Sequence, residues 1–195
     1  MANRPITPKE RKAWNFAKEA HKGQIRKFVN KPYFGAHVVK VNGIVKQYTT
    51  EEDILCAALL HDVVEDCFED PEVGYHIIEE EFGKRVADIV MELTSSKEDI
   101  DDNYNSKADY LIVKMIHMTD DALIIKLADR LQNISDAFTA SERFRNKYFQ
   151  ETVQIMTELE GHRRYNRVQD LLVNQIKMKL ENISSIFKIK RFDEI

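Results

Sequence analysis

The sequence is poor in cysteine, glycine and proline, and each shortage excludes a class of protein. Its 195 residues include two cysteines, six glycines and four prolines. Two cysteines cannot form a disulfide framework, so we expect free thiols at Cys56 and Cys67 in a reducing compartment. Glycine and proline are too rare for collagen-like, proline-rich or low-complexity disordered chains.

Long apolar runs and an excess of one charge are also missing. No run approaches the ~18 residues of a membrane-spanning helix, and the first ten residues lack the apolar segment of a secretory signal. The 29 basic and 33 acidic side chains sum to −4. We therefore expect a cytoplasmic protein that binds neither nucleic acid nor membranes, and any site for a polyanion must be a local basic patch. The oligomeric state stays open.

Helical periodicity is abundant. Thr7 with Glu10, and Thr49 with Glu52, have the spacing of capping boxes. Helices are predicted over residues 8–21, 36–47, 51–66, 71–81, 84–93, 107–117 and 121–137, and over 141–187 with a break near Gly161. The segments 23–35 and 95–106 are predicted loops. We predict one all-α domain over residues 1–187 and a C-terminal tail over 188–195.

Ionisable side chains fall on the apolar face of the helix predicted over 51–66. A continuous helix there places His61, Asp62, Glu65 and Asp66 on the arc that buries Ile54. Burying a charge without a partner costs several kcal/mol. These groups therefore require either a water-filled cleft or a cation.

A second predicted helix, over 121–137, carries an inward carboxylate at Asp129, with Asn133 one turn later. A divalent metal held by His61, Asp62 and Asp129 would explain both helices, and His37 is the best candidate for a fourth ligand. Mixed nitrogen and oxygen donors suit Mn²⁺, Fe²⁺, Co²⁺ or Zn²⁺ better than Ca²⁺. The plain alternatives are a hydrogen-bonded core histidine and a helix–helix salt bridge at Asp129.

The same residues resemble the signature of a known family. His37, the His61-Asp62 pair and Asp129 resemble the H…HD…D pattern of the HD-domain metal-dependent phosphohydrolases. The ordered blocks AHKGQIRK (20–27), PYFGAH (32–37), ALLHDVVED (58–66), EFG (81–83) and IKLADRLQNISD (125–136) are similar to the hydrolase domain of RelA/SpoT proteins and to stand-alone small alarmone hydrolases.

The resemblance implies an all-α HD-domain helical bundle with a central metal cleft. It also implies hydrolysis of guanosine 3′,5′-bis(diphosphate), ppGpp or pppGpp, to GDP or GTP and pyrophosphate, with one divalent metal, usually Mn²⁺. The residues that it assigns are the metal ligands His37, His61, Asp62 and Asp129, the acidic pair Glu65 and Asp66 that orients or deprotonates water, and the substrate contacts Arg26, Lys27, Asn133 and Tyr148.

Some positions depart from the family pattern. Val38 stands where the family usually has proline. Phe144 stands where the family has an arginine, and Arg143 or Arg145 could take over the role of that arginine. The chain offers no room for the synthetase domain of the long family members. Alternative functions are hydrolysis of another nucleotide, such as NADPH or a deoxynucleotide, and a catalytically silent nucleotide-binding module. Arg26 and Lys27 could also be ordinary solvated charges.

Overall fold

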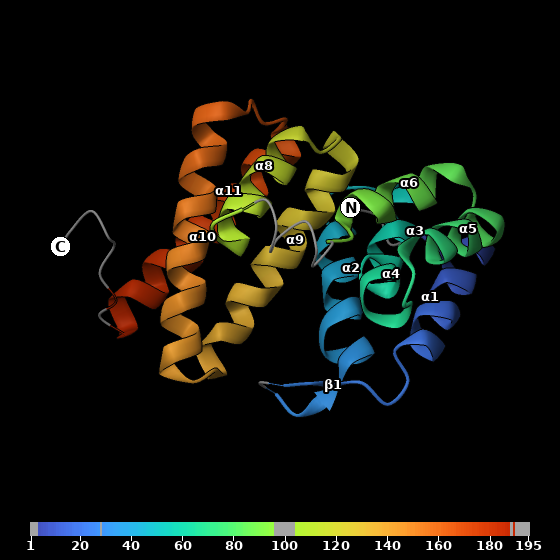
Figure 1. Ribbon diagram of the computed structural model, residues 1–195, viewed down its shortest axis with the longest axis horizontal. Helices are drawn as coiled ribbons and strands as arrows, with labels where there is room; N and C mark the ends of the chain where they lie inside the picture. Colours follow the sequence, from blue (N-terminus) through green and yellow to red (C-terminus); the bar gives the residue numbers. More distant parts are fainter. Residues whose placement is uncertain (1–3, 28, 96–103, 188, 190–195) are drawn as a thin grey trace. The chain divides into compact units, whose positions relative to one another are not determined.

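A computed structural model describes residues 4–27, 29–95, 104–187 and 189. Helices dominate these residues, beside a single pair of two-residue strands in the described ranges (Figure 1). The predicted all-α class is therefore confirmed. The chain divides into two compact units, residues 1–96 and 97–195. Cys56 and Cys67 are free thiols, as predicted.

The first unit is built around one helix that is buried almost throughout. Its elements are α1 (Pro8–Ala20), β1 (Ile25–Arg26), β2 (Lys31–Pro32), the π-helical turn η1 (Phe34–Val38), α2 (Val39–Val45), α3 (Glu52–Leu60), α4 (Val63–Cys67), α5 (Pro71–Phe82) and α6 (Lys84–Leu93). Every side chain of α3 from Ile54 to Leu60 is buried. Helices α1, α2 and α6 pack around α3, which explains why its sequence is apolar on all sides.

The two helix starts with capping-box spacing in this unit have different outcomes. Thr7 Oγ1 accepts a hydrogen bond from the Glu10 backbone N–H at 3.1 Å, so the first cap is confirmed. The Glu10 side chain, however, forms a salt bridge with Arg4. The prediction at Thr49 was wrong, because Thr49 Oγ1 accepts from Glu51 N–H and Glu51 is the N-cap of α3.

The prediction of a continuous helix over 51–66 was also wrong, since α3 ends at Leu60 and α4 begins at Val63. His61 Nδ1 lies 3.0 Å from the carbonyl oxygen of Ala58. In an unbroken helix that oxygen would accept from the backbone N–H of Asp62. The side-chain bond at this carbonyl accompanies the break, and the helical-wheel positions assigned beyond it do not apply.

The basic loop predicted over 23–35 contains a short antiparallel hairpin, in which Ile25 pairs with Pro32 and Arg26 with Lys31. The hairpin leads directly into η1, which carries His37. Phe34 in η1 packs edge-on against Trp14 of α1, with ring centroids 5.0 Å apart. The helix predicted over 36–47 is therefore a π-helical turn followed by a shorter α2, and its start is anchored on α1.

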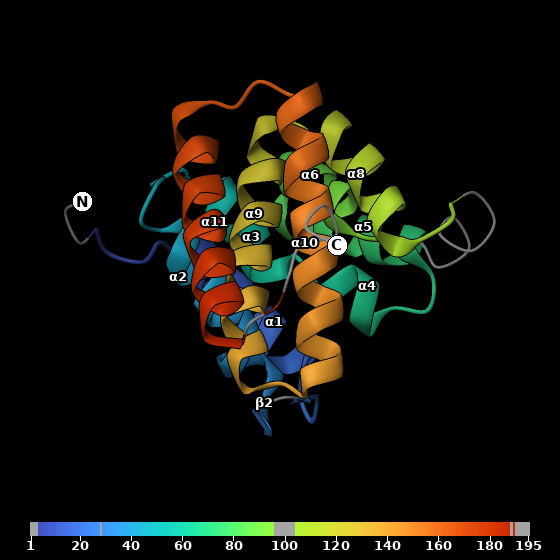
Figure 2. The same cartoon turned by 90° about the vertical axis from the view of Figure 1, so that its left-hand side faces the viewer.

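The second unit consists of α8 (Lys107–His117), α9 (Asp120–Asp136), the 3₁₀ turn η2 (Ala137–Thr139), α10 (Glu142–His162) and α11 (Arg167–Phe187). Helix α9 is the core element and packs along α11, while α8 packs on α10 (Figure 2). The predicted break near Gly161 falls just after it, at 163–166. Most of the predicted loop 95–106 and of the predicted tail lies outside the described residues.

One arginine joins three parts of the second unit. Arg163, between α10 and α11, donates from Nη1 to the carbonyl oxygens of Ile116 at 2.9 Å and Met118 at 2.5 Å. Its Nη2 donates to Asp120 Oδ1 at 3.0 Å. These acceptors lie at the end of α8 and the start of α9. Arg163 thus satisfies carbonyls that a helix C-terminus leaves without partners.

None of the helices in the described part of the chain combines the length and apolar character that a membrane crossing requires.

Candidate active site

Three predicted metal ligands converge in the first unit. His37 extends from η1, and His61 and Asp62 form the turn between α3 and α4. The His37 and His61 Nε2 atoms are 3.3 Å apart. Asp62 Oδ2 lies 3.0 Å from His61 Nε2 and 3.3 Å from His37 Nε2. Both imidazoles are buried, with 1% and 2% of the side chain exposed. We call these three residues the His–His–Asp cluster.

The chemistry of the cluster fits a divalent transition metal. The Ala58 carbonyl can only accept, so His61 Nδ1 carries a proton and Nε2 is the nitrogen available to a metal. Two imidazole nitrogens and one carboxylate oxygen then point at one another. Such a mixed set suits Mn²⁺, Fe²⁺, Co²⁺ or Zn²⁺ rather than Ca²⁺.

Asp62 is held in its ionised form. Burial by itself raises the pKa of Asp62, but the nearby His61 and the close approach of the two imidazoles outweigh it and hold the pKa well below the ordinary value. A carboxyl group must be deprotonated to bind a metal. Asp62 therefore meets that condition across the physiological range.

Glu65 and Asp66 lie on α4, and both residues reach solvent, although part of the Asp66 side chain is covered. Their predicted position on a buried arc was wrong, because that position assumed an unbroken helix. Glu65 Oε2 accepts a hydrogen bond from Ser95 N–H at 2.8 Å. Partial burial and the neighbouring carboxylates of Asp62 and Glu65 raise the pKa of Asp66 to about 6. Asp66 therefore exchanges a proton closer to neutrality than an ordinary aspartic acid.

The basic pair lies on the hairpin. Lys27 is exposed, whereas Arg26 is half-buried and its guanidinium lies 5.5 Å from the ring centroid of Tyr33. The Tyr33 hydroxyl in turn donates to Asp62 Oδ2 at 2.6 Å. Tyr33 therefore contacts both a predicted substrate-binding residue and a predicted metal ligand.

The remaining predicted site residues gather in the second unit. Asp129 is buried on α9, where Asn133 Nδ2 donates to its Oδ1 at 2.7 Å and Lys126 Nζ lies 3.5 Å from its Oδ2. Tyr148 extends from α10, and the Arg130 guanidinium lies 5.1 Å from its ring centroid. Burial raises the pKa of Tyr148 despite the nearby Arg130 charge and a hydrogen bond from Asn133. Tyr148 therefore remains a neutral phenol.

Arg143 and Arg145, which could replace the arginine expected at position 144, have different surroundings. Arg143 is exposed. Arg145 donates to the Ala140 carbonyl at 3.2 Å, and its guanidinium lies 3.6 Å from the Phe187 ring centroid. Phe144 itself stacks on Tyr148, with ring centroids 5.7 Å apart. Arg145 is therefore engaged in packing within the second unit.

Sequence reasoning missed Tyr33, Lys126 and Arg130. Two of them have a helical spacing that could have identified them: Tyr33 precedes His37 by four residues, and Lys126 precedes Asp129 by three. Residues at these spacings share one side of a helical turn. The structure places both next to a predicted ligand.

The family model described as HD domain matches residues 13–164. The chain belongs to the HD domain family. For an HD domain a divalent metal is implied, in agreement with the donor atoms of the His–His–Asp cluster. The matched range includes every site residue predicted from the sequence.

Several curated relatives are named for (p)ppGpp or guanosine-3′,5′-bis(diphosphate). The chain is 32% identical over 176 residues to the bifunctional (p)ppGpp synthase/hydrolase SpoT of Escherichia coli K12, a match that covers 89% of this chain and 23% of SpoT. It is 33% identical over 155 residues to the guanosine-3′,5′-bis(diphosphate) 3′-pyrophosphohydrolase of Aquifex aeolicus, covering 78% of this chain and 21% of that protein. The chain thus spans less than a quarter of the length of these curated relatives.

A solved structure matches over its whole length. It is described as a metazoan ortholog of SpoT that hydrolyzes ppGpp and plays a role in starvation responses. The TM-score is 0.73 at 27% sequence identity, and the match covers 97% of this chain and 100% of that one. The HD helical fold predicted from the sequence is therefore confirmed.

Proposed function

We propose that this HD domain hydrolyses ppGpp or pppGpp to GDP or GTP and pyrophosphate with the help of a divalent metal. The observation that carries the proposal is the buried His–His–Asp cluster, which supplies the H and HD of the signature beside a basic hairpin. The identity of the substrate is inferred from the relatives, because the names of the SpoT-like proteins and the description of the matching structure concern ppGpp.

In this proposal His37, His61, Asp62 and Asp129 are the metal ligands, and Mn²⁺ is the metal. Asp129 joins the set because it is the last residue of the H…HD…D pattern and is a buried carboxylate fixed by Asn133 and Lys126. Zn²⁺, Fe²⁺ and Co²⁺ suit the same donors. When bound, a divalent ion supplies Lewis-acid activation of water and of a phosphoryl oxygen.

The remaining residues bind the nucleotide and move protons. Arg26 and Lys27 would neutralise the diphosphate, and Asn133 and Tyr148 would contact the nucleotide. Glu65 or Asp66 would orient the attacking water and accept its proton, for which the raised pKa of Asp66 is favourable. A bond forms between the water oxygen and the proximal phosphorus, the bond from that phosphorus to the ribose 3′-oxygen breaks, and the 3′-oxygen takes up a proton.

The partner implied is thus a small nucleotide. The cytoplasmic location, the absence of nucleic-acid and membrane partners, and the single domain over residues 1–187 remain predictions.

Product analysis tests the proposal. The purified chain would be incubated with ppGpp, pppGpp, NADPH, dATP and dGTP, with Mn²⁺ or with chelator, and the products separated by ion-exchange chromatography. We expect metal-dependent conversion of ppGpp to GDP and pyrophosphate, with slower turnover of the others. Preferred hydrolysis of NADPH or a deoxynucleotide would contradict the proposed substrate but would still agree with the proposed metal site. Metal binding without turnover of any nucleotide would identify a silent binding module.

A further inference from the structure

We propose that Tyr33 is a positioning residue that orients two groups of the site at once: its hydroxyl fixes the Asp62 carboxylate for metal binding, and its ring fixes the Arg26 guanidinium for the substrate. The inference rests on the proposed function, because it takes the His–His–Asp cluster as a metal site and Arg26 as a substrate contact.

The first contact is a short hydrogen bond to a predicted ligand atom. Tyr33 Oη lies 2.6 Å from Asp62 Oδ2. The same oxygen lies close to the Nε2 atoms of His37 and His61. Hydrogen bonds from a hydroxyl to a carboxylate are short and roughly twice as strong as neutral ones. The bond therefore limits rotation of the carboxylate and keeps Oδ2 directed at the imidazoles.

The second contact uses the face of the same ring. The Arg26 guanidinium lies 5.5 Å from the Tyr33 ring centroid, within cation–π range. Arg26 is on β1, and the chain between it and Tyr33 is the hairpin turn and β2. The ring thus holds the base of the hairpin at a set distance from the cluster.

Tyr33 is itself well fixed. Its backbone N–H donates to the Gln24 carbonyl at 2.9 Å. Its ring lies between two histidines, with centroids 5.1 Å from His21 and 5.2 Å from His37. His21 is buried and its Nδ1 is paired with Gln24 Oε1 at 2.8 Å. A side chain locked in this way can position its neighbours, which a mobile one cannot.

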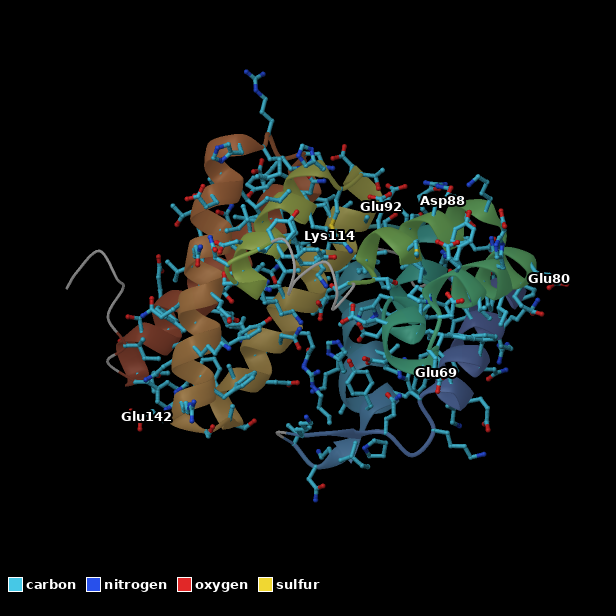
Figure 3. All side chains as sticks on the ribbon, in the orientation of Figure 1. Glu69, Glu80, Asp88, Glu92, Lys114 and Glu142 are labelled. Atoms are coloured by element: carbon cyan, nitrogen blue, oxygen red, sulfur yellow. The ribbon has the colours of Figure 1, made fainter. Side chains whose placement is uncertain are left out.

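The two contacts can be separated by substitution. Tyr33→Phe removes the hydroxyl and keeps the ring, whereas Tyr33→Leu removes both. The chain also offers a matched control in Tyr75, whose hydroxyl donates to Asp88 Oδ1 at 2.9 Å between α5 and α6 (Figure 3 labels Asp88). Tyr75→Phe breaks the same kind of bond in the same unit, away from the cluster.

The full-length chain, stripped of metal, would be titrated with Mn²⁺ by calorimetry, and KM and kcat for ppGpp would be measured at saturating Mn²⁺. We expect Tyr33→Phe to weaken Mn²⁺ binding by about 10- to 100-fold, as is usual when a hydrogen bond to a metal ligand is lost, and to leave KM nearly unchanged. Tyr33→Leu should weaken Mn²⁺ binding equally and also raise KM several-fold. Tyr75→Phe should alter neither quantity.

Wild-type Mn²⁺ affinity in Tyr33→Phe would overturn the role of the hydroxyl, and an unchanged KM in Tyr33→Leu would overturn the role of the ring. A destabilised variant still gives an answer, because the rise of its melting temperature with Mn²⁺ reports the same affinity. If the wild-type chain binds Mn²⁺ but hydrolyses no ppGpp, the proposed substrate fails while the Mn²⁺ comparison still decides the role of the hydroxyl. Absence of Mn²⁺ binding in the wild-type chain would overturn this inference and the choice of Mn²⁺, and product analysis with the other divalent ions would then decide the proposed hydrolysis separately.

Discussion

At the scale of single residues, two of the predicted metal ligands are each held by a hydrogen bond from a specific neighbour. Asp62 is bonded by Tyr33, and Asp129 is bonded by Asn133. The identity of the predicted ligands followed from their residue types at inward positions. The bonds that hold them did not, because they depend on where a side chain from another turn or element ends.

Asp129→Asn tests the predicted ligand in the second unit. The amide keeps the shape and can still accept from Asn133, but it lacks the charge that a metal ligand supplies. Turnover of ppGpp should fall by more than ~100-fold, a larger loss than second-layer changes cause, with little change in melting temperature. Asp170→Asn, an exposed change on α11, is the control and should retain full activity. An active Asp129→Asn enzyme would remove Asp129 from the ligand set.

Asp120 predicts a pH dependence of stability. A hydrogen bond from Gln169, together with the hydrogen bond and charge of Arg163, outweighs the opposing effect of burial and lowers the pKa of Asp120 below its ordinary value. Because the pKa is lower in the folded chain, this stabilisation is present above the unfolded pKa and is lost as the pH falls through the folded pKa. The melting temperature of Asp120→Asn should therefore lie below wild type at pH 7, and the difference should shrink as the pH falls below the ordinary pKa of an aspartic acid. A constant difference between pH 3 and pH 7 would contradict this assignment.

At the scale of elements, the sequence predicted most helices closely and failed at particular junctions. The segments 84–93 and 107–117 were predicted with the observed ends, since their apolar periodicity stops where the helix stops. The break between α3 and α4 was not predicted. Periodicity does not reveal the hydrogen bond between the His61 side chain and the Ala58 carbonyl that accompanies this break. The hairpin was missed because strands of two residues are too short to show alternation.

Two glycines give predictions of opposite sign. Gly83 joins α5 to α6 with φ 88° and ψ 158°, a conformation that is essentially restricted to glycine. Gly83→Ala should destabilise the fold by about 1–3 kcal/mol. Gly43 is exposed within α2, and a Cβ there meets no atom within 4 Å. Gly43→Ala should stabilise by about 0.5–1 kcal/mol. Urea unfolding measures both changes, and the same sign for both would refute this argument.

Arg163 connects the end of α8 to the start of α9, so its removal should lower the stability of the fold. Its guanidinium donates to carbonyls at the end of α8 and to Asp120, with a side chain only 12% exposed. Hydrogen bonds of charged groups contribute about 1.5–3 kcal/mol each, so Arg163→Ala should lower the unfolding free energy by at least about 2 kcal/mol. The adjacent Arg164 is exposed, and Arg164→Ala is expected to change stability by less than about 0.5 kcal/mol. Equal effects of the two substitutions would show that the helix-end bonds contribute little.

At the scale of the whole molecule, the resemblance of five ordered sequence blocks gave the family and the fold before any geometry. Composition indicated only a weakly acidic globular chain, and periodicity added that the chain is helical. The division of contacts into units 1–96 and 97–195 was not predicted, because no change of composition marks it. The boundary lies in a polar segment that the sequence identified only as a loop.

Metal removal gives a prediction for the molecule as a whole. A ligand that binds only the folded state stabilises it by RT ln(1 + [L]/Kd), which is about 2.7 kcal/mol at a concentration 100 times Kd. Addition of Mn²⁺ to chelator-treated protein should therefore raise its melting temperature by several degrees. Ca²⁺ should raise it far less, since Ca²⁺ prefers six to eight oxygen ligands over imidazole. Equal shifts with the two ions would argue against the His–His–Asp cluster as the site.

The chain has a single tryptophan, Trp14, and its ring contacts Phe34 at the start of the turn that carries His37. Residues 97–195 contain none. Fluorescence excited at the long-wavelength edge of the indole band, where tyrosine does not absorb, therefore comes from the first unit alone, whereas far-ultraviolet dichroism reports the helices of both. Recording the two signals on one sample during denaturation would separate the melting of the two units without any label, and the emission of Trp14 would follow changes around the turn of His37 in real time.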